Sequence, residues 1–399
     1  MNILFLMKAY DIGGIEVVAA TLADCFVKHG HRVCIATFNK PDAMMQARTN
    51  PEIKIYTIGK YKYSAANVDR LHEILRNNMI DVVINQWGLP YVPCRVLCKA
   101  KKGLNIKTIA VYHNQIDTNA RIKDAEIALA STNNPLYRII LQIKKAIVRQ
   151  ITSASMRYVY NHSDIYQVLS PSYVELFKSF TGIKNPSKLM VQTNPVTVDG
   201  SNFHYMQAKK QKEIIYMGRI DYNQKRVFRV IDTWALLEND FPDWRLTIIG
   251  DGIERKNIEK QVKELKLKHV HFEGFQKPEP YYERASLLLL TSEYEGFPLV
   301  LAECMSFGVV PVVYDSYSAV GDIINNKIDG ITIPYHSSGY DANEAAQSIK
   351  AIMISDCNRD KMAIAAIEKS KCYAINSIYD NWEKTFNTIK KELDKYDEN

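Results

Sequence analysis

The stretch that decides the fold is residues 287–313, which read LLLLTSEYEGFPLVLAECMSFGVVPVV. Short apolar runs at its start and at its end flank a longer segment, 299–307, that has a helical pattern. Pro298 suits the first turn of that helix, and Gly308 suits its end. A strand, a helix and a second strand in this order predict a β-α-β unit, and therefore an α/β fold built on parallel sheets.

The same alternation of apolar runs and amphipathic stretches continues on both sides. It predicts two α/β domains, 1–196 and 197–376, separated by a polar and aperiodic linker at 196–212, and a final charged amphipathic helix at 377–399. The predicted strands are 2–7, 32–37, 81–85, 107–112, 165–170 and 188–194 in the first domain, and 213–217, 244–249, 270–273, 287–290 and 309–313 in the second. Because ligands bind at the carboxyl ends of such strands, we expect a cleft where the two domains face each other.

The composition excludes two broad classes of protein. Of the 399 residues, 47% are hydrophobic and 24% are charged, which fits neither a disordered chain nor a polytopic membrane protein. No apolar run reaches the roughly 20 residues of a spanning helix, and residues 1–7 do not resemble a secretory signal. Seven cysteines without a Cys-x-x-Cys motif suit a reducing compartment, so we expect a cytoplasmic protein.

The positive charge is local. Residues 1–196 contain 25 basic and 13 acidic residues, whereas the remainder contains 26 and 31. Within the first part, 134–151 predicts a basic amphipathic helix that interleaves apolar side chains with Arg138, Lys144, Lys145 and Arg149. Such a helix lies on an anionic membrane surface or docks on its own domain, and the pattern alone leaves both open. No aromatic platform accompanies the charge, so we expect no nucleic-acid partner.

Two turns contain paired glycines. The turn with Gly13 and Gly14 follows the first strand, where a helix N-terminus and close backbone approach suit a nucleotide phosphate. It is neither Gly-x-Gly-x-x-Gly nor a P-loop, which disfavours an NAD dehydrogenase. The second turn, with Gly250 and Gly252, is interpreted as structural.

Charged side chains follow two strands of the second domain. Glu295 precedes the helix at 299–307, and Glu303 lies inside this apolar helix, where an unpaired carboxylate is costly, so both are expected to meet a polar ligand. A surface loop acid together with a buried ion pair is the alternative. Arg219 and Lys225 follow the strand at 213–217 and form a candidate cationic clamp for a diphosphate leaving group. A solvated basic loop is the alternative. In the first domain, His113 ends a strand and is a candidate sugar contact, with a packing or capping role as the alternative.

These motifs together resemble the family 4 retaining glycosyltransferases of GT-B fold. The resemblance rests on Glu-Gly-Phe-Pro-Leu-Val-Leu-Ala-Glu at 295–303, on Gly218-Arg219 with Lys225, on Gly13-Gly14, and on Asn194-Pro195 before the linker. It implies two Rossmann-like domains, an acceptor on the first, a nucleotide-sugar donor on the second, and a final helix that packs back on the first domain. It also implies retention of the anomeric configuration, with the departing phosphate oxygen taking the acceptor proton.

The resemblance also implies roles for single residues. Glu303 would bind the ribose hydroxyls, Glu295 the hydroxyls of the donor sugar, and Arg219 and Lys225 the diphosphate, while His113 would help position the reacting centre. Backbone N–H groups would join the diphosphate contacts at a further set of positions, namely Gly14, Gly296, Phe297 and Leu299. Lys225 lies one residue further from Arg219 than is usual, and Arg226 replaces the usual glycine, so Gln224 or Arg226 could share the clamp.

The sequence thus predicts a hexosyltransferase that moves a hexose or N-acetylhexosamine from a UDP-linked donor to a lipid-linked saccharide in bacterial surface polysaccharide or lipopolysaccharide assembly. No Asp-x-Asp occurs, so neither a metal nor another cofactor is expected. The protein is expected to be peripheral on the inner face of the plasma membrane. A nucleotide-sugar epimerase of the same fold and a non-catalytic nucleotide-sugar-binding module are the alternatives.

Overall fold

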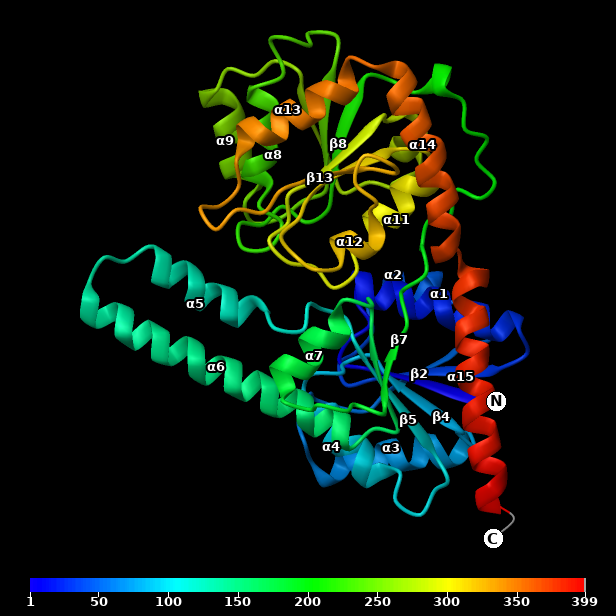
Figure 1. The fold of residues 1–399 in the computed structure, drawn as a ribbon. Coiled ribbons are helices and arrows are strands. Elements are labelled where there is room, and N and C mark those ends of the chain that lie inside the picture. Colours follow the sequence, from blue (N-terminus) through cyan, green and yellow to red (C-terminus); the bar gives the residue numbers. More distant parts are fainter. Residues whose placement is uncertain (398–399) are drawn as a thin grey trace. The chain divides into compact units, whose positions relative to one another are not determined.

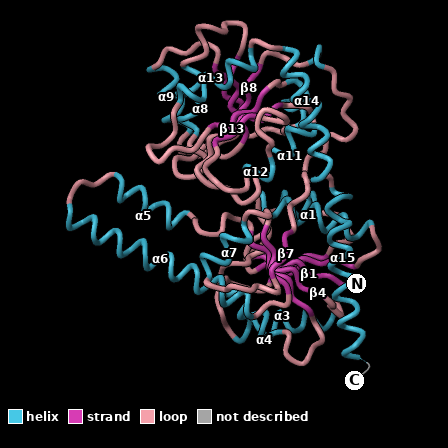
Figure 2. The backbone as a smooth tube through the Cα atoms, viewed as in Figure 1, coloured by secondary structure: helices cyan, strands magenta, loops and turns pink. Residues whose placement is uncertain are grey.

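In the computed structural model, which describes residues 1–397, the chain forms two compact units. Unit 1 comprises Met1–Thr197 together with the chain from Ile375 onward, and unit 2 comprises Val198–Ala374. Each unit is a parallel β-sheet with helices packed around it (Figures 1 and 2). The predicted α/β class, with two Rossmann-like sheets, is confirmed.

The seven-stranded sheet of unit 1 has the order β3-β2-β1-β4-β5-β6-β7, and all of its pairings are parallel. Its strands are β1 (Asn2–Met7), β2 (Arg32–Thr37), β3 (Lys54–Thr57), β4 (Val82–Asn85), β5 (Lys107–Tyr112), β6 (Ile165–Val168) and β7 (Leu189–Val191). Its helices are α1 (Gly14–Lys28), α2 (Ala43–Arg48), α3 (Ala65–Asn77), α4 (Tyr91–Ala100), α5 (Ala120–Ala130), α6 (Pro135–Asn161), α7 (Tyr173–Thr181) and α15 (Ile375–Asp397). The central strands are buried on both faces, which is why they are continuous apolar runs.

Helix α15 belongs to unit 1 although it lies at the far end of the chain. Its aromatic side chains Trp382 and Phe386 pack edge-on against Phe26 of α1, with ring centroids 5.6 and 5.1 Å apart. The hydroxyl of Tyr379 lies 3.0 Å from Nε2 of His31. Unit 1 is therefore completed by two segments that are separated in sequence by the whole of unit 2.

The six-stranded sheet of unit 2 has the order β10-β9-β8-β11-β12-β13 and is also parallel. Its strands are β8 (Glu213–Met217), β9 (Arg245–Ile249), β10 (Val270–Gly274), β11 (Leu287–Leu290), β12 (Val310–Tyr314) and β13 (Ile331–Ile333). Its helices are α8 (Val227–Ala235), α9 (Arg255–Glu264), α10 (Glu279–Arg284), α11 (Leu299–Ser306), α12 (Val320–Ile323), α13 (Ala342–Met353) and α14 (Asp356–Ser370). The direction of winding reverses between β8 and β11, and in unit 1 between β1 and β4, and sheets of this kind bind ligands at such switch points.

The stretch quoted at the outset forms β11, α11 and β12, as predicted. Pro298 is the N-cap of α11, and Phe307 and Gly308 follow its last residue. Gly308 has φ +70°, and a Cβ atom there would lie 2.5 Å from the ring of Tyr205. Glycine is therefore needed at this helix end for its conformation and for the close approach of Tyr205.

Candidate functional site

The β8–α8 loop of unit 2 is folded around the carboxylate of Asp221. One oxygen of Asp221 accepts hydrogen bonds from the backbone N–H groups of Gln224 at 2.7 Å and Lys225 at 3.0 Å. The other oxygen accepts from Nε of Arg219 at 2.9 Å. Asp221 thus fixes both predicted clamp residues at the carboxyl end of β8. Sequence reasoning missed it, because a single acid in a polar loop carries no signal of its own.

The predicted phosphate cation and the predicted sugar acid contact each other. Nζ of Lys225 lies 2.5 Å from Oε1 of Glu295, and the two side chains are only 16% and 8% exposed. Nε2 of Gln224 donates to the other carboxylate oxygen of Glu295 at 3.3 Å. The side chain of Arg219 is 65% exposed. The structure therefore joins the loop after β8 to the loop after β11, with Arg219 as the cation open to solvent.

Arg226 occupies a strained position directly after the clamp. Its φ of +53° and ψ of +44° lie in the left-handed region, where glycine is favoured, and it is the N-cap of α8. The guanidinium lies over the ring of Tyr222 at 4.9 Å and over that of Phe228 at 5.8 Å. The backbone thus has a conformation that accounts for the glycine usual at this place, and the arginine side chain is held by two aromatic rings.

Glu303 is held by a tyrosine from another helix. It lies on α11 and is 5% exposed, and the hydroxyl of the fully buried Tyr282 on α10 donates to its Oε2 at 3.2 Å. Burial, and then the charge of Glu303, raise the pKa of Tyr282 well above its ordinary value, so this tyrosine remains a donor. Tyr282 is a positioning residue that the sequence did not reveal, since it lies 21 positions earlier in the chain.

The start of α11 lies beside these side chains. Gly296 and Phe297 are buried, and the ring of Phe297 packs against Tyr373 with centroids 5.2 Å apart. Leu299 is the first residue of α11, whose N-terminus has no side-chain cap. Backbone N–H groups at such an end bind anions, so the predicted phosphate contacts are compatible with this geometry.

Gly250 and Gly252 allow two loops of unit 2 to touch through their backbones. A Cβ atom on Gly250 would lie 1.9 Å from the carbonyl oxygen of Gly218, and one on Gly252 would lie 2.1 Å from that of Ile220. The structure supports the structural interpretation of this turn, which holds the β8–α8 loop in place.

Gly14 and His113 belong to unit 1. Gly14 is the first residue of α1 and follows Gly13, the N-cap, which offers no side-chain cap to the helix. His113 follows β5, and its Nε2 contacts Oε1 of Gln86 after β4. Burial lowers the pKa of His113 to about 4, so the ring is neutral at physiological pH. A cavity of about 200 Å³ lies between these loops and the start of α1.

The basic side of α6 contacts unit 1 and its apolar side faces solvent, which is the reverse of the usual arrangement for a surface helix. Three of the four predicted cations bond within unit 1: Lys145 with Glu126 of α5 at 2.8 Å, and Arg138 and Arg149 with backbone carbonyls. The apolar face is the one in solvent, because six of its side chains are more than half exposed, namely Leu136, Ile139, Ile140, Ile143, Ile147 and Ile151. These six residues form the α6 stripe. The helix does pack on its own unit, but through its basic side and its C-terminal half, and the α6 stripe is left exposed.

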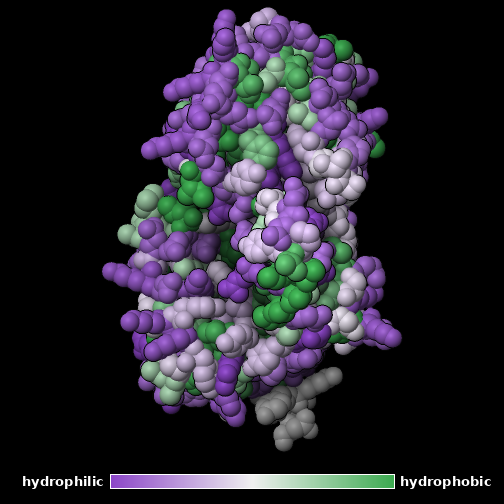
Figure 3. All heavy atoms as spheres, turned by 90° about the vertical axis from the view of Figure 1, so that its left-hand side faces the viewer, coloured by the Kyte–Doolittle hydropathy of each residue, from purple (hydrophilic) through white to green (hydrophobic). Residues whose placement is uncertain are grey.

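The helices α5 and α6 project together from unit 1 (Figure 1). The space-filling view of the side to which they point shows apolar residues gathered in patches among polar ones (Figure 3). Over residues 1–397, the helices are all too short or too polar to cross a bilayer.

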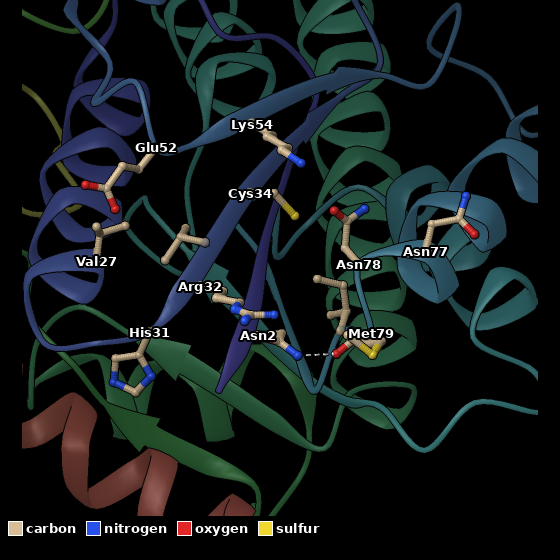
Figure 4. Close-up of a pocket in the computed structure, with 12 residues that line it drawn as sticks. Asn2, Val27, His31, Arg32, Cys34, Glu52, Lys54, Asn77, Asn78 and Met79 are labelled. Carbon is tan, nitrogen blue, oxygen red and sulfur yellow. Dashed lines mark hydrogen bonds between the residues drawn. The ribbon is translucent and has the colours of Figure 1, made fainter.

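A second hollow of unit 1 holds none of the predicted site residues. It has a volume of about 370 Å³ and lies at the amino ends of β1 to β3, where Asn2, Arg32 and Lys54 line it (Figure 4). Ligands of parallel sheets bind at the opposite edge, so we do not assign it to the site. Among residues 1–397, no three His, Cys, Asp or Glu side chains cluster as a metal site would need.

Two family models match the chain. Residues 12–199 match Glycosyltransferase Family 4, and residues 202–369 match Glycosyl transferases group 1. Each match corresponds closely to one structural unit.

One curated relative and two solved structures are similar over almost the full length, and a second curated relative is similar over about a third of the chain. A GalNAc-α-(1→4)-GalNAc-α-(1→3)-diNAcBac-PP-undecaprenol α-1,4-N-acetyl-D-galactosaminyltransferase of Campylobacter jejuni is 23% identical, over 98% of this chain and 99% of that protein. The Escherichia coli lipopolysaccharide 1,6-galactosyltransferase is 30% identical over 36% of this chain and 41% of its own length. The crystal structures of TarM and of Anabaena HepE with UDP both have a TM-score of 0.74, at 14% and 15% identity. They cover 97% of this chain and 98% and 100% of their own chains, and they share its GT-B fold.

Proposed function

Because the chain belongs to the hexosyltransferases that carry a Glycosyltransferase Family 4 domain and a group 1 domain, we propose the following reaction. The protein transfers a hexose or an N-acetylhexosamine from a UDP-linked donor, with retention, to a lipid-linked saccharide. The observation that carries the proposal is the meeting of Arg219, Lys225 and Glu295 at the switch point of the unit 2 sheet, beside the start of α11, the helix that bears Glu303.

The ribose, the diphosphate and the sugar of the donor would each bind to unit 2. The carboxylate of Glu303, oriented by Tyr282, accepts hydrogen bonds from two adjacent ribose hydroxyls. The diphosphate binds to the cationic side chains of Arg219 and Lys225 and accepts hydrogen bonds from the N–H groups at the start of α11. Glu295 accepts from hydroxyls of the sugar, and its contact with Lys225 holds the carboxylate in place until the donor arrives.

Charge stabilisation at the leaving group is the main catalytic contribution in this proposal. As the bond to the sugar breaks, negative charge grows on the diphosphate, and fixed cations lower the energy of that state. The acceptor attacks the face that the diphosphate leaves, and the departing phosphate oxygen takes the acceptor proton. No metal has a role in the proposal, since the sequence has no Asp-x-Asp.

A donor screen tests the proposed UDP-linked donor and the assignment of Glu295 and Glu303 to its site. Purified protein is incubated with UDP- and GDP-linked hexoses and N-acetylhexosamines, and release of the nucleotide is measured with and without a polyprenyl-diphosphate saccharide. We expect turnover with a UDP sugar and at least a hundredfold loss in Glu295→Ala and Glu303→Ala. Parent-like turnover in both variants would overturn the site assignment. UDP is chosen as the nucleotide because the Anabaena HepE and pneumococcal GtfA structures contain it.

The α6 stripe supports an acceptor that is presented by a membrane. The stripe exposes six large apolar side chains, and residues 95–157 carry 12 basic against three acidic residues. Apolar insertion combined with positive charge is how surface helices bind anionic bilayers. We therefore propose that unit 1 sits on the inner face of the plasma membrane, as a peripheral protein in polysaccharide or lipopolysaccharide assembly.

Vesicle flotation tests the membrane proposal. The parent is expected to float with vesicles containing phosphatidylglycerol. An Ile140→Ser/Ile143→Ser/Ile147→Ser variant is expected to remain in the bottom fraction of the gradient. These changes are preferable to neutralising Lys145 or Arg149, because both cations also fasten α6 to its unit. Flotation of the triple variant like the parent, or a dimer of the parent that the variant abolishes, would contradict the membrane as the occupant.

A further inference from the structure

The unit 1 cavity has a wall whose polar groups are not all satisfied by the protein. Within residues 1–397, three of its side chains each carry a buried polar atom with no hydrogen-bond partner: Nε2 of Gln86, Nε1 of Trp87 and Nδ1 of His113. A buried polar group without a partner has lost its hydrogen bonds to water and gained none in return. Three such atoms around one hollow are therefore unusual, and they call for an explanation by something that enters it.

The contact between Gln86 and His113 fixes what each group offers. Oε1 of Gln86 can only accept, so Nε2 of His113 carries the proton and donates it. In the neutral ring the other nitrogen, Nδ1, is then an acceptor. The wall consequently holds one acceptor, on His113, and two donors, on Gln86 and Trp87. Sugar hydroxyls both donate and accept, and they suit such a mixed set.

The wall is held rigidly by its own backbone. The side chain of Asn85 accepts from the N–H of Trp87 at 3.1 Å. The N–H of Gly88 donates to the carbonyl of Val111 at 2.9 Å, and a Cβ atom on Gly88 would lie 2.7 Å from the same oxygen. The hydroxyl of Tyr166 donates to the carbonyl of Gly88 at 2.8 Å. A pre-formed wall does not lose conformational entropy when a ligand binds, which favours a binding role.

The base of α6 is fastened to both sides of this cavity. Oγ of Ser155 donates to the carbonyl of Leu89 at 2.7 Å, and Nδ2 of Asn119 contacts Oγ1 of Thr152 at 3.3 Å. Leu89 and Asn119 are both lining residues. The helix that bears the exposed apolar stripe therefore leads directly to the hollow, so a saccharide whose lipid lies along the stripe would reach it.

We propose that Gln86 and Trp87 bind hydroxyl groups of the saccharide acceptor in this cavity, and that Gln86 also positions His113 by fixing its tautomer. The inference rests on the proposed function in one respect, that the acceptor binds to unit 1. Gln86 and Trp87 then determine which acceptor sugar is used, because a buried donor left without its hydroxyl disfavours the wrong one.

Two substitutions test the hydroxyl contacts. Trp87→Phe keeps an aromatic ring but removes the indole N–H together with its five-membered ring, and Gln86→Met keeps the length and deletes the amide. We expect each to raise the KM for the saccharide acceptor three- to tenfold, while the dissociation constant of UDP stays unchanged. Gln46→Met, on the exposed face of α2, is the matched control and should behave like the parent. An unchanged acceptor KM in both cavity variants, or a change in UDP binding instead, would overturn the proposal.

The tautomer provides a readout that is independent of turnover. In the parent, the ¹⁵N spectrum of His113 should show a protonated Nε2 and a bare Nδ1. Gln86→Glu retains an acceptor for Nε2–H and should preserve this state while raising the pKa of His113, whereas Gln86→Met should release a mixture of tautomers. The same mixture in the parent would overturn the positioning role.

Saturation-transfer spectra with methyl hexosides and methyl N-acetylhexosaminides measure saccharide binding directly. If Trp87→Phe weakens this binding, the acceptor site is supported even if the proposed UDP donor is wrong. Binding by that variant equal to that of the parent would contradict the site.

Discussion

Nζ of Lys225 and Oε1 of Glu295 are 2.5 Å apart in unit 2, although 70 positions separate them in sequence. The pair gives a buried carboxylate a cationic partner in addition to Gln224, and Glu295 lies just before the start of α11. In the proposed reaction the same lysine serves a second anion, the diphosphate. The pair is thus a structural element before donor binding and a part of the site after it.

A double-mutant cycle of Lys225→Met, Glu295→Gln and the double variant measures the coupling of this pair. Lys225→Met leaves Glu295 buried without its cation, so we expect a loss of about 3 kcal/mol in the free energy of unfolding. The double variant Lys225→Met/Glu295→Gln should recover most of that loss, but both variants should bind UDP at least tenfold more weakly. Urea unfolding and calorimetry give the two quantities. Additive stability changes would show that the pair is not coupled.

Tyr282→Phe tests the positioning of Glu303. Loss of a hydrogen bond to a carboxylate is expected to cost about 2 kcal/mol of stability and to weaken UDP binding several-fold. Tyr281→Phe is the neighbouring control, because the hydroxyl of Tyr281 donates to Glu273 at 3.1 Å, away from Glu303. Calorimetric titration with UDP checks both variants. Equal affinities in the two would show that Tyr282 does not act through the donor site.

Arg226 allows the strain of one backbone position to be isolated. Arg226→Gly and Arg226→Ala both remove the guanidinium from Tyr222 and Phe228, so they differ mainly in the cost of a left-handed φ. We expect the glycine variant to be more stable than the alanine variant by about 1 kcal/mol. Thermal unfolding of the two proteins side by side gives this difference, and a more stable alanine variant would contradict the prediction.

Lys210 should make the stability of unit 2 depend on pH. Its Nζ donates to the carbonyl of Tyr282 at 2.7 Å, and burial lowers its pKa from 10.5 to about 7. Between pH 7 and 10.5 the unfolded chain binds more protons at this site than the folded chain does, so stability contributed by Lys210 rises with pH across that window. Below pH 7 both states are protonated and this contribution levels off.

The variant Lys210→Met removes that titration. Its free energy of unfolding, measured by urea between pH 6.5 and 9, should lack the part of the rise that the parent shows. Lys209→Met, at the exposed neighbouring position, should retain the parent's profile. Identical profiles for parent and Lys210→Met would mean that the lysine titrates normally.

The elements that the sequence predicted well are those with two independent signals. The unit β11-α11-β12 combined apolar runs with Pro298 and Gly308, and its prediction was confirmed. Strand β3 was not predicted, because Lys54–Thr57 is a short edge strand with only two central apolar residues and no clear period-two pattern. The sequence also named Lys225 and Glu295 as separate ligands of a donor, but their mutual contact depends on β8 and β11 being neighbours, which spacing along the chain does not encode.

The residues that hold the site side chains in place could not be predicted from the sequence either, because their contacts depend on which elements are neighbours in space. Asp221, Tyr282 and Gln86 carry no motif, and each acts by holding another side chain. In α6 the pattern identified an apolar stripe and four cations, but not that α5 binds the basic side. That arrangement depends on Glu126 and on carbonyl groups outside the helix.

The return of α15 to unit 1 has a consequence for the order in which the protein is made. A ribosome that has synthesised all of unit 2 has still not supplied Tyr379, Trp382 or Phe386, so Phe26 and His31 lack their partners until the last helix emerges. The unit that begins first is therefore finished last. Nascent unit 1 exposes the aromatic surface around Phe26 throughout the synthesis of unit 2. A ribosome that stalls before residue 375 leaves that surface accessible to chaperones and proteases.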